Sequence, residues 1–455
     1  MELLKRINNE KHTERVLQFG EGNFLRGFVD WMFDRLNKDC SGDFGVVVVQ
    51  PLPVGRVDGL NAQDGLYTLC LRGLINGVKA EEEHTIDCIT RGINPYENTN
   101  EFFECAENPD LRYIVSNTTE AGIEYRKEKC DFRTTTFPGR LTMFLKARYD
   151  AGLGGFLLLP CELIDKNGDC LKECVLKYAA DWNYGKDFAR WINEENVFTN
   201  TLVDRIVTGY PRDTADEMCR KYGYIDNFIV TAEIFHLWVI EGSKKYADEL
   251  PFDRAGLNVI WTNDVTPYKK RKVRILNGAH TALVSPAMLM GIETVREALD
   301  HEVLSAYIKK AVFEEIIPTI NMSENELAGF AYDVFDRFRN PFLNHLWSSI
   351  ALNSVSKFRV RILPGIKDYT DKFGTLPRCL VFSLAALIVF YKTENANDDP
   401  AVIDFIKKAQ VAEILSNTDL WDTDLTYLLE SVEEDIKSIE NNGISAAVKL
   451  AAGRK

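Results

Sequence analysis

An alternation of short, apolar β-runs with helical segments most restricts what this chain can fold into. Residues 44–51, FGVVVVQP, form a continuous β-branched run, which is typical of a strand buried on both faces of a parallel sheet. Residues 15–20 predict an earlier strand that leads through a glycine turn into an amphipathic helix at 24–36. Helices near 98–106 and 140–149 then alternate with strands at 111–117 and 155–160. Such alternation predicts an α/β fold with a doubly wound sheet and right-handed crossovers.

Two other patterns complete the predicted organisation. The pair Asn76-Gly77 between two β-runs, 67–73 and 78–88, is a strong type I′ hairpin signal, so we expect an antiparallel ribbon within the alternation. After about residue 265 the pattern becomes helical, with helices expected at 267–290, 295–316, 324–339, 341–358, 376–391 and 402–415. We therefore predict a dinucleotide-binding domain at 1–264 and a mostly α-helical substrate and catalytic domain at 265–455.

Composition limits the possible partners. The 455 residues carry a net charge of −14, which argues against general affinity for nucleic acid. The N-terminus lacks the apolar stretch of a signal peptide, and the longest apolar run, 379–391, is shorter than the roughly 20 residues of a membrane span. The ten cysteines include no CxxC pair and are expected to be reduced. We expect a cytoplasmic protein without a membrane partner; the sequence does not predict its oligomeric state.

A glycine turn follows the first predicted strand and opens the first helix. It reads Gly20-Glu21-Gly22-Asn23-Phe24-Leu25. Glycines at this place let the backbone approach the pyrophosphate of a dinucleotide, as in a Rossmann-like domain, and Arg26 could reach a phosphate. The usual third glycine is replaced by Leu25, so an ordinary strand–helix turn is the alternative interpretation.

The ends of two other strands bear on the cofactor. Carboxyl ends of parallel strands bind such ligands, so we expect the nicotinamide near Asn117, Thr118, Thr119 and Glu120. The second strand ends at Gln50, where many NAD enzymes place an acid for the adenosine ribose, and Arg56 follows shortly after. These residues alone leave the choice between NAD and NADP open.

The segment 268–280 is the best candidate for the chemical centre. On a helix, Lys272, His280 and Asn277 fall at about 0°, 80° and 140°, so one face can present all three to a small ligand. A buried lysine near other cations can exchange a proton at neutral pH, and an amide and an imidazole can stabilise a developing oxyanion. The alternative is a solvated basic helix face with no role in catalysis.

Two rival chemistries fit less well. Tyr268 with Lys272, and Tyr125 with Lys129, form the YxxxK pair of short-chain dehydrogenases. Tyr125 lies in a charged segment, however, and Tyr268 comes too late in the chain for that family. The six histidines are scattered without ligand spacing, so catalytic zinc is disfavoured and a metal-free site is predicted.

The motifs together resemble the polyol-specific long-chain dehydrogenase family, whose type member is mannitol 2-dehydrogenase. The resemblance covers nearly the whole chain and is carried by motifs in the family's order: GxGxFxR at 20–26, QDGLYTL at 63–69, TTEAG at 118–122, N-x2-VDRI at 200–206, K-x4-N-x2-H at 272–280 and RFxNP at 337–341. It implies NAD as cofactor, Lys272 as the acid/base, and Asn277 and His280 as oxygen donors. It also implies a basic substrate contact, matched best by Lys357, with Arg359 and Arg361 as less secure candidates.

Within the family, the likeness is greatest to the branch that acts on sugar acids. That branch implies an NAD-dependent interconversion of D-tagaturonate and D-altronate. Two positions depart from the mannitol pattern: the second oxyanion asparagine falls on Leu163, and the proton-relay glutamate falls on Lys269. A base in place of an acid near the reacting centre favours an anionic substrate. Reduction of fructuronate, oxidation of a neutral polyol, and a catalytically silent NAD-binding regulator remain the alternatives.

Overall fold

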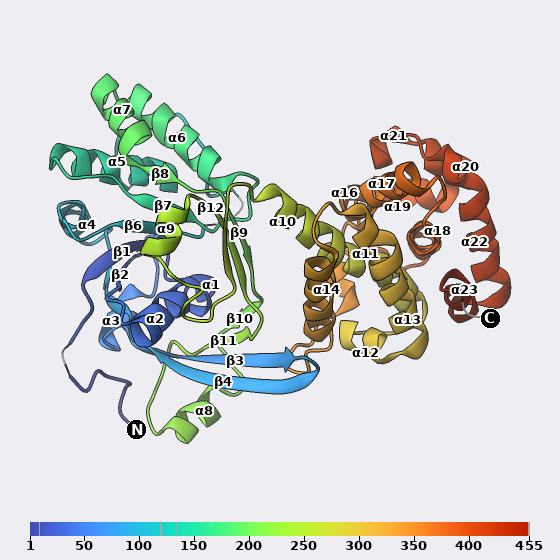
Figure 1. The fold of residues 1–455 in the computed structure, drawn as a ribbon, viewed down its shortest axis with the longest axis horizontal. Coiled ribbons are helices and arrows are strands. Elements are labelled where there is room, and N and C mark those ends of the chain that lie inside the picture. The colour runs from blue at the N-terminus through green and yellow to red at the C-terminus, as the bar shows by residue number, and fades with distance from the viewer. Residues whose placement is uncertain (9, 119–120, 134, 454–455) are drawn as a thin grey trace. The chain divides into compact units, whose positions relative to one another are not determined.

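The computed structural model describes residues 1–8, 10–118, 121–133 and 135–453 (Figure 1). Its contacts divide the chain into two compact units. The first comprises Met1–Arg72 and Ala80–Val265, and the second comprises Gly73–Lys79 and Thr266–Lys455. The first unit is built on sheets and the second on helices.

A six-stranded sheet forms the centre of the first unit. Its strand order is β5-β2-β1-β6-β7-β8, and every neighbouring pair is parallel. The strands are β1 (Glu14–Phe19), β2 (Gly45–Val49), β5 (Ile89–Ile93), β6 (Tyr113–Ser116), β7 (Leu157–Pro160) and β8 (Val197–Phe198). The β-branched run of β2 is buried throughout, as the sequence predicts. The strand order reverses at β1, which confirms a doubly wound α/β fold.

Alternating side chains of these strands pack into two separate hydrophobic cores, one on each face of the sheet. Val46 and Val48 pack with helix α2 (Val29–Cys40), whereas Val47 and Val49 pack in the core on the other face. That second face is covered by α4 (Thr99–Ala106), α5 (Phe137–Asp150), α6 (Asn167–Asp181) and α7 (Lys186–Glu195), as Figure 1 shows. Because a strand turns successive side chains to opposite faces, an unbroken valine run can fill both cores.

Smaller sheets accompany the central one. Strands β3 (Tyr67–Ile75) and β4 (Val78–Ile86) form the predicted hairpin, and both Asn76 and Gly77 have positive φ, as a type I′ turn requires. The hairpin extends a sheet with β10 (Val207–Gly209) and β11 (Val230–Glu233). A further sheet of β9 (Thr201–Asp204), β12 (Leu237–Glu241) and β13 (Val259–Thr262) was not predicted.

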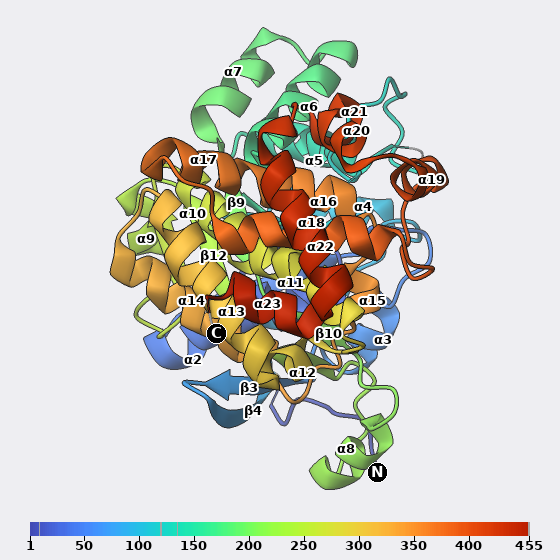
Figure 2. The same cartoon turned by 90° about the vertical axis from the view of Figure 1, so that its right-hand side faces the viewer.

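The second unit is helical, as expected, and Figure 2 looks onto it. Its central helix, α18 (Arg378–Tyr391), is buried along nearly its whole length and packs against α11 (Gly278–Leu289) and α22 (Leu429–Asn442). The long apolar run is therefore a core helix. Among the described residues, no helix combines the length and the apolar character that crossing a bilayer requires.

Four helices predicted for the second unit are wrong in detail. The helix expected at 295–316 comprises α12 (Val295–Asp300), α13 (Glu302–Lys310) and the π-helical segment η2 (Ala311–Ile316), and the helix expected at 402–415 is divided into α19 (Pro400–Lys408) and α20 (Val411–Ser416). The helix expected at 267–290 is α10 (Thr266–Arg271), then a π-helical segment η1 (Lys272–Asn277), then α11. The helix expected at 341–358 is broken into α15 (Trp347–Ile350) and α16 (Ser354–Arg361). Asn353 adopts a left-handed conformation just before α16, with φ 52°, which no continuous right-handed helix allows.

Helix α2 buries an acid directly beneath the glycine turn. Asp30 is fully buried and accepts a hydrogen bond of 3.3 Å from the Gln18 side chain, which also donates to the Gly20 carbonyl at 3.0 Å. Burial raises the pKa of Asp30 to about 7, against the opposing charge of Arg26, while nearby Asp34 adds to the rise. The folded protein therefore holds a proton on Asp30 more tightly than the unfolded chain does.

This buried acid predicts a pH-dependent stability. The contribution of Asp30 is fully present below about pH 4 and is lost as the pH rises towards 7, at about 1.4 kcal/mol per pKa unit at most. Asp30→Asn removes this dependence, so the variant gains stability relative to the parent between pH 4 and 7. Denaturant unfolding at a series of pH values measures the difference. Asp58→Asn, an exposed acid on α3 (Val57–Ala62), is the control; parallel curves for Asp30→Asn and the parent would contradict the prediction.

Candidate functional site

The glycine turn joins β1 to the short helix α1 (Asn23–Gly27). Gly20 has φ +117°, a conformation that strongly favours glycine. Gly22 differs, because its backbone is extended, with φ −66° and ψ 159°. Beyond its two chain neighbours, a Cβ placed on Gly22 would meet no described atom within 4 Å. Neither conformation nor packing thus requires glycine at 22, whereas a ligand lying close to the backbone would.

Arg26 lies underneath this turn. Its side chain is 2% exposed and donates to the Glu21 carbonyl (3.1 Å), the Asn23 side chain (2.6 Å) and the Phe228 carbonyl (2.6 Å). The guanidinium also lies 5.2 Å from the ring centre of Tyr67. This geometry favours a role in holding the turn over direct contact with a phosphate. Direct cofactor contact by Asn23, Phe24 and Arg26 stays a prediction.

The end of β6 lies beside the turn. Phe19 of β1 is in register with Ser116, and the Asn117 carbonyl is 3.8 Å from the Cβ position of Gly20. Asn117 and Thr118 are half-buried there. The two remaining residues of the predicted nicotinamide contact, Thr119 and Glu120, lie outside the described residues. The parallel pairing of β1 and β6 therefore brings the glycine turn and the 117–118 segment together.

Sequence reasoning missed Glu162, which follows β7. Its carboxylate is buried and accepts hydrogen bonds from the Ser116 hydroxyl (3.1 Å), the Thr118 amide (3.0 Å) and the Thr118 hydroxyl (3.2 Å). Burial raises its pKa, against these hydrogen bonds. The position of Glu162 could have indicated its role, because a buried acid that closely follows a buried parallel strand needs hydrogen-bond donors from the same edge of the sheet. Glu162 holds the 117–118 segment in place.

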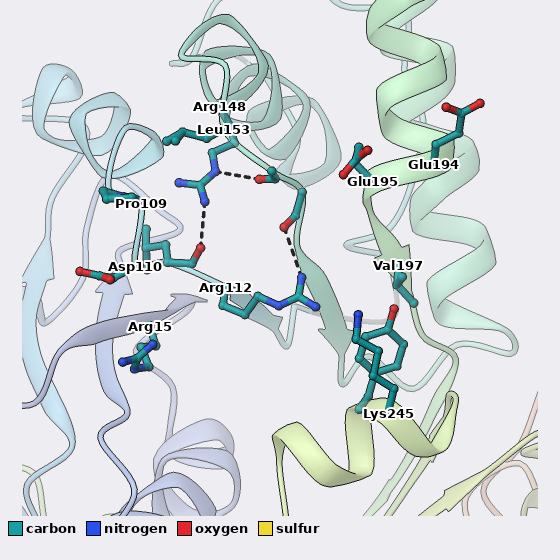
Figure 3. A pocket seen from close by; sticks show the side chains of 14 residues that line it. Arg15, Pro109, Asp110, Arg112, Arg148, Leu153, Glu194, Glu195, Val197 and Lys245 are labelled. Atoms are coloured by element: carbon teal, nitrogen blue, oxygen red, sulfur yellow. Dashed lines mark hydrogen bonds between the residues drawn. The ribbon is translucent and has the colours of Figure 1, made fainter.

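A cavity of about 560 Å³ lies at the opposite edge of this sheet (Figure 3). It opens near the amino ends of β6 and β7 and includes none of the predicted site residues. Its basic side chains have structural partners: Arg148 donates to backbone carbonyls, including Gly154, and Arg112 pairs with Glu249. Dinucleotides bind at the carboxyl edge of such sheets, so this cavity is not the predicted cofactor site.

The second unit begins with a basic segment, residues 269–274, whose side chains differ in their acidic partners. Lys270 and Arg274 both pair with Asp368, at 3.2 and 2.9 Å, and Arg271 pairs with Glu326 at 2.7 Å. For these three side chains the structural interpretation holds. Lys272 stands among them, half-buried, at the first position of the π-helix.

The π-helix changes how Lys272 and Asn277 lie. In an α-helix, residues five apart are separated by about 140° around the axis. In a π-helix, each amide donates to the carbonyl five residues earlier, so Asn277 lies close to one turn after Lys272. His280 follows in the first turn of α11. Both Asn277 and His280 are half-buried. A joint catalytic role for the three stays a prediction, which this backbone favours.

His280 lies in a cluster of aromatic and basic side chains, which we call the His280 cluster; its other members are Phe338, His345, Arg337 and Arg361. The imidazole stacks on Phe338 at 4.1 Å and meets His345 edge-on at 5.2 Å between ring centres. Its buried Nε2 atom has no hydrogen-bond partner among the described residues. Burial, followed by the charges of His345, Arg337 and Arg361, lowers the pKa of His280 well below its usual value. The ring is therefore neutral and can offer one donor to a ligand.

Helix α16 separates the three cations predicted to contact substrate. Arg361 donates to the Thr281 hydroxyl of α11 at 3.4 Å, and Lys357, one turn earlier, donates to the Ile350 carbonyl at 2.9 Å. Burial, followed by the charge of Arg361, lowers the pKa of Lys357. Arg359 lies on another face and pairs with Asp422 at 3.0 Å. Arg361 thus lies near His280, and Lys357 lies one helical turn from Arg361, whereas the geometry does not support a substrate contact by Arg359.

Comparisons with known proteins extend over both units. Altronate oxidoreductase from Bacillus subtilis is 45% identical over 435 residues, covering 92% of this chain and 90% of the relative. Altronate oxidoreductase from Phocaeicola vulgatus is 43% identical and covers 98% of this chain and 99% of the relative. The corresponding enzyme of Escherichia coli is also 43% identical, with coverage of 96% and 97%.

Solved structures share the fold. D-Sorbitol dehydrogenase in a substrate-free form superposes with a TM-score of 0.84 at 22% identity, covering 98% of this chain and 97% of that one. Pseudomonas fluorescens mannitol 2-dehydrogenase, in a ternary complex with NAD and D-mannitol, gives 0.69 at 21% identity, with coverage of 100% and 97%. Residues 14–254 match the family model of the mannitol dehydrogenase Rossmann domain, and residues 264–440 match that of the mannitol dehydrogenase C-terminal domain. The chain belongs to the mannitol dehydrogenase family.

Proposed function

We propose that this protein is an NAD-dependent oxidoreductase that interconverts D-tagaturonate and D-altronate in the cytoplasm. Residues 1–264 bind the dinucleotide, and residues 265–455 supply the substrate contacts and the proton. The observation that carries the proposal is the His280 cluster, in which a neutral imidazole on the family's signature lies among cations suited to an anionic substrate. The altronate oxidoreductases that this chain resembles at 43–45% identity support the same substrate.

The dinucleotide is assigned to the glycine turn. Gly20, Gly22, Asn23, Phe24 and Arg26 form or support it, and Asn117, Thr118, Thr119 and Glu120 are assigned to the nicotinamide end. The open space at Gly22 supports this assignment, because a pyrophosphate can approach the backbone there. When bound, the nicotinamide supplies or accepts the hydride.

The second unit supplies the remaining chemistry. During reduction, Lys272 gives a proton to the ketone oxygen, and during oxidation it takes the proton back. The Asn277 amide and the His280 imidazole donate hydrogen bonds to that oxygen as its negative charge grows. A neutral imidazole serves as such a donor without becoming the proton source, which leaves the acid/base role to Lys272.

The basic side chains around His280 discriminate between substrates. A uronate carries a carboxylate, whereas a neutral ketose has only hydroxyl groups. Lys357 and Arg361 flank the helix that bears His280. Partial burial destabilises their charged forms, since it lowers the pKa of each. A carboxylate ligand offsets that cost, which favours a sugar acid over mannitol or fructose.

Substitution of Lys357 tests the substrate class. Lys357→Met should lower kcat/KM for tagaturonate with NADH by about 10- to 150-fold, the value of a charge-assisted hydrogen bond. The loss with fructose should be much smaller. Arg359→Met removes the same charge from another face of α16 and should change neither substrate by more than a few-fold. Steady-state assays with tagaturonate, fructuronate and fructose make the comparison; equal losses on all three would refute a carboxylate contact.

Substitution of Lys272 tests the chemistry. Lys272→Ala should lower kcat by about 10²- to 10⁴-fold while NADH still binds, because general acid–base catalysis typically contributes that much. Lys270→Ala is the matched control, since Lys270 pairs with Asp368, and it should stay within a few-fold of the parent. Added small amines should partly rescue Lys272→Ala. A Lys272→Ala enzyme of near-parental rate would remove Lys272 from the mechanism, and a parent that binds NADH without turning over any of the ketones would indicate a regulator.

Two glycine substitutions test the cofactor site. Gly22→Val should raise the Kd for NADH sharply while the Tm stays close to that of the parent, because the backbone is extended and the Cβ position is open. Gly20→Val should instead lower the Tm, because φ +117° strains any other residue. Fluorescence titration and thermal unfolding give the two quantities. Unchanged NADH affinity in Gly22→Val would place the dinucleotide elsewhere.

A further inference from the structure

The residue at the end of β2 does not perform the task usually found there. In dinucleotide-binding sheets, an acid at this strand end accepts hydrogen bonds from the adenosine ribose. Here the position is Gln50, which is buried and 3% exposed. Its side-chain amide donates to the Leu52 carbonyl (2.9 Å), and its carbonyl accepts from the Val57 amide (3.4 Å). Both ends of Gln50 are thus committed to its own loop.

A carboxylate from the glycine turn reaches the same place. Glu21 Oε1 accepts a hydrogen bond of 3.3 Å from the Arg56 backbone amide, in the loop that follows β2. A Cβ built on Gly55 would lie 2.5 Å from Glu21 Oε1 and would also overlap the end of the Gln50 side chain. Glu21, Gln50 and Gly55 are therefore in contact. The turn after β1 brings an acid to the end of β2, where the strand itself supplies none.

This carboxylate is poorly neutralised. Glu21 Oε2 is buried and has no hydrogen-bond partner among the described residues. The guanidinium groups of Arg26 and Arg56, two residues that hydrogen-bond to Glu21, have partners other than its carboxylate. Arg26 donates to the Glu21 backbone carbonyl and not to its carboxylate, and Arg56 lies over the Phe228 ring at 4.3 Å while donating to the Asn227 carbonyl at 2.6 Å. Glu21 thus combines negative charge with unused acceptor capacity.

From this geometry we infer that Glu21 reads the adenosine ribose of the cofactor and makes the protein select NAD over NADP. The inference rests on the proposed dinucleotide site and adds a specificity residue to it. Ribose hydroxyls are donors, and the carboxylate lacks donors. A 2′-phosphate brings negative charge and, at neutral pH, mainly acceptor oxygens, so it would meet both repulsion and unmatched hydrogen bonding. Gln50, with its amide already bonded, leaves this discrimination to Glu21.

Binding measurements on the folded protein test the inference without any turnover. NADH and NADPH are titrated against the parent, Glu21→Gln and the control Asp58→Asn, with Tm recorded for each. The parent should bind NADH far more tightly than NADPH. Glu21→Gln should weaken NADH binding by about 10- to 150-fold and tighten NADPH binding, because a neutral amide removes the repulsion. Asp58→Asn makes the same change of net charge at an exposed position of α3 and should leave the preference unchanged.

The outcomes separate this inference from the proposed function. An unchanged NADH/NADPH ratio in folded Glu21→Gln overturns the role of Glu21 and leaves the dinucleotide site intact. Binding of neither nucleotide by the folded parent overturns both. If Glu21→Gln does not fold, binding measurements on the parent alone test the inference. ADP-ribose should then bind more tightly than its 2′-phosphorylated form, by a margin that shrinks with added salt as a charge repulsion is screened. Equal binding of the two overturns the inference.

Discussion

Parallel pairing of β1 with β2 on one side and with β6 on the other organises the first unit. The chain leaves the carboxyl end of β1 through Gly20, and the neighbouring strands end at Gln50 and Ser116, so three loops meet along one edge. The cofactor assignment depends on this meeting. Glu162 secures the loop after β6, and Arg26 secures the turn after β1. A ligand at that edge meets the glycine turn and the 117–118 segment, which are already held by hydrogen bonds, and this lowers the cost of ordering them on binding.

The basic side chains of the second unit differ in their partners. Several of them lie near Lys272 and have acidic partners: Asp368 pairs with Lys270 and Arg274, and Glu326 pairs with Arg271. On α16, Asp422 pairs with Arg359. Within the His280 cluster, burial, followed by the charges of His345, Arg337 and Arg361, lowers the pKa of His280. The same arrangement that destabilises a protonated histidine stabilises a bound anion. The cations that help to keep His280 neutral are therefore the ones that the proposed sugar-acid substrate would meet.

The sequence predicted the elements whose signals are local. The β2 valine run, the Asn76-Gly77 turn and the buried α18 are examples, because burial on both faces, positive φ and continuous apolarity leave marks in adjacent residues. The β9-β12-β13 sheet escaped prediction because its strands are short and pair across distant segments. The partners of Arg26, Arg359 and Glu162 escaped for the same reason, since their contacts are tertiary. A sequence motif predicted Lys272, Asn277 and His280, but it did not predict the π-helix that contains the first two.

The π-helical turn also bears on how this protein tolerates changes of length. A π-helix holds one residue more per turn than an α-helix. Deletion of a single residue between Lys272 and Asn277 would allow an ordinary α-helix to form without any loss of backbone hydrogen bonding. In that α-helix Lys272 and Asn277 would be four positions apart, about 400°, which is again close to one turn. The deletion should therefore keep the two side chains on one face. The same deletion within the regular helix α11 would instead turn the residues after it by about 100°, so the π-helical turn is the place in this region where a change of length is best tolerated.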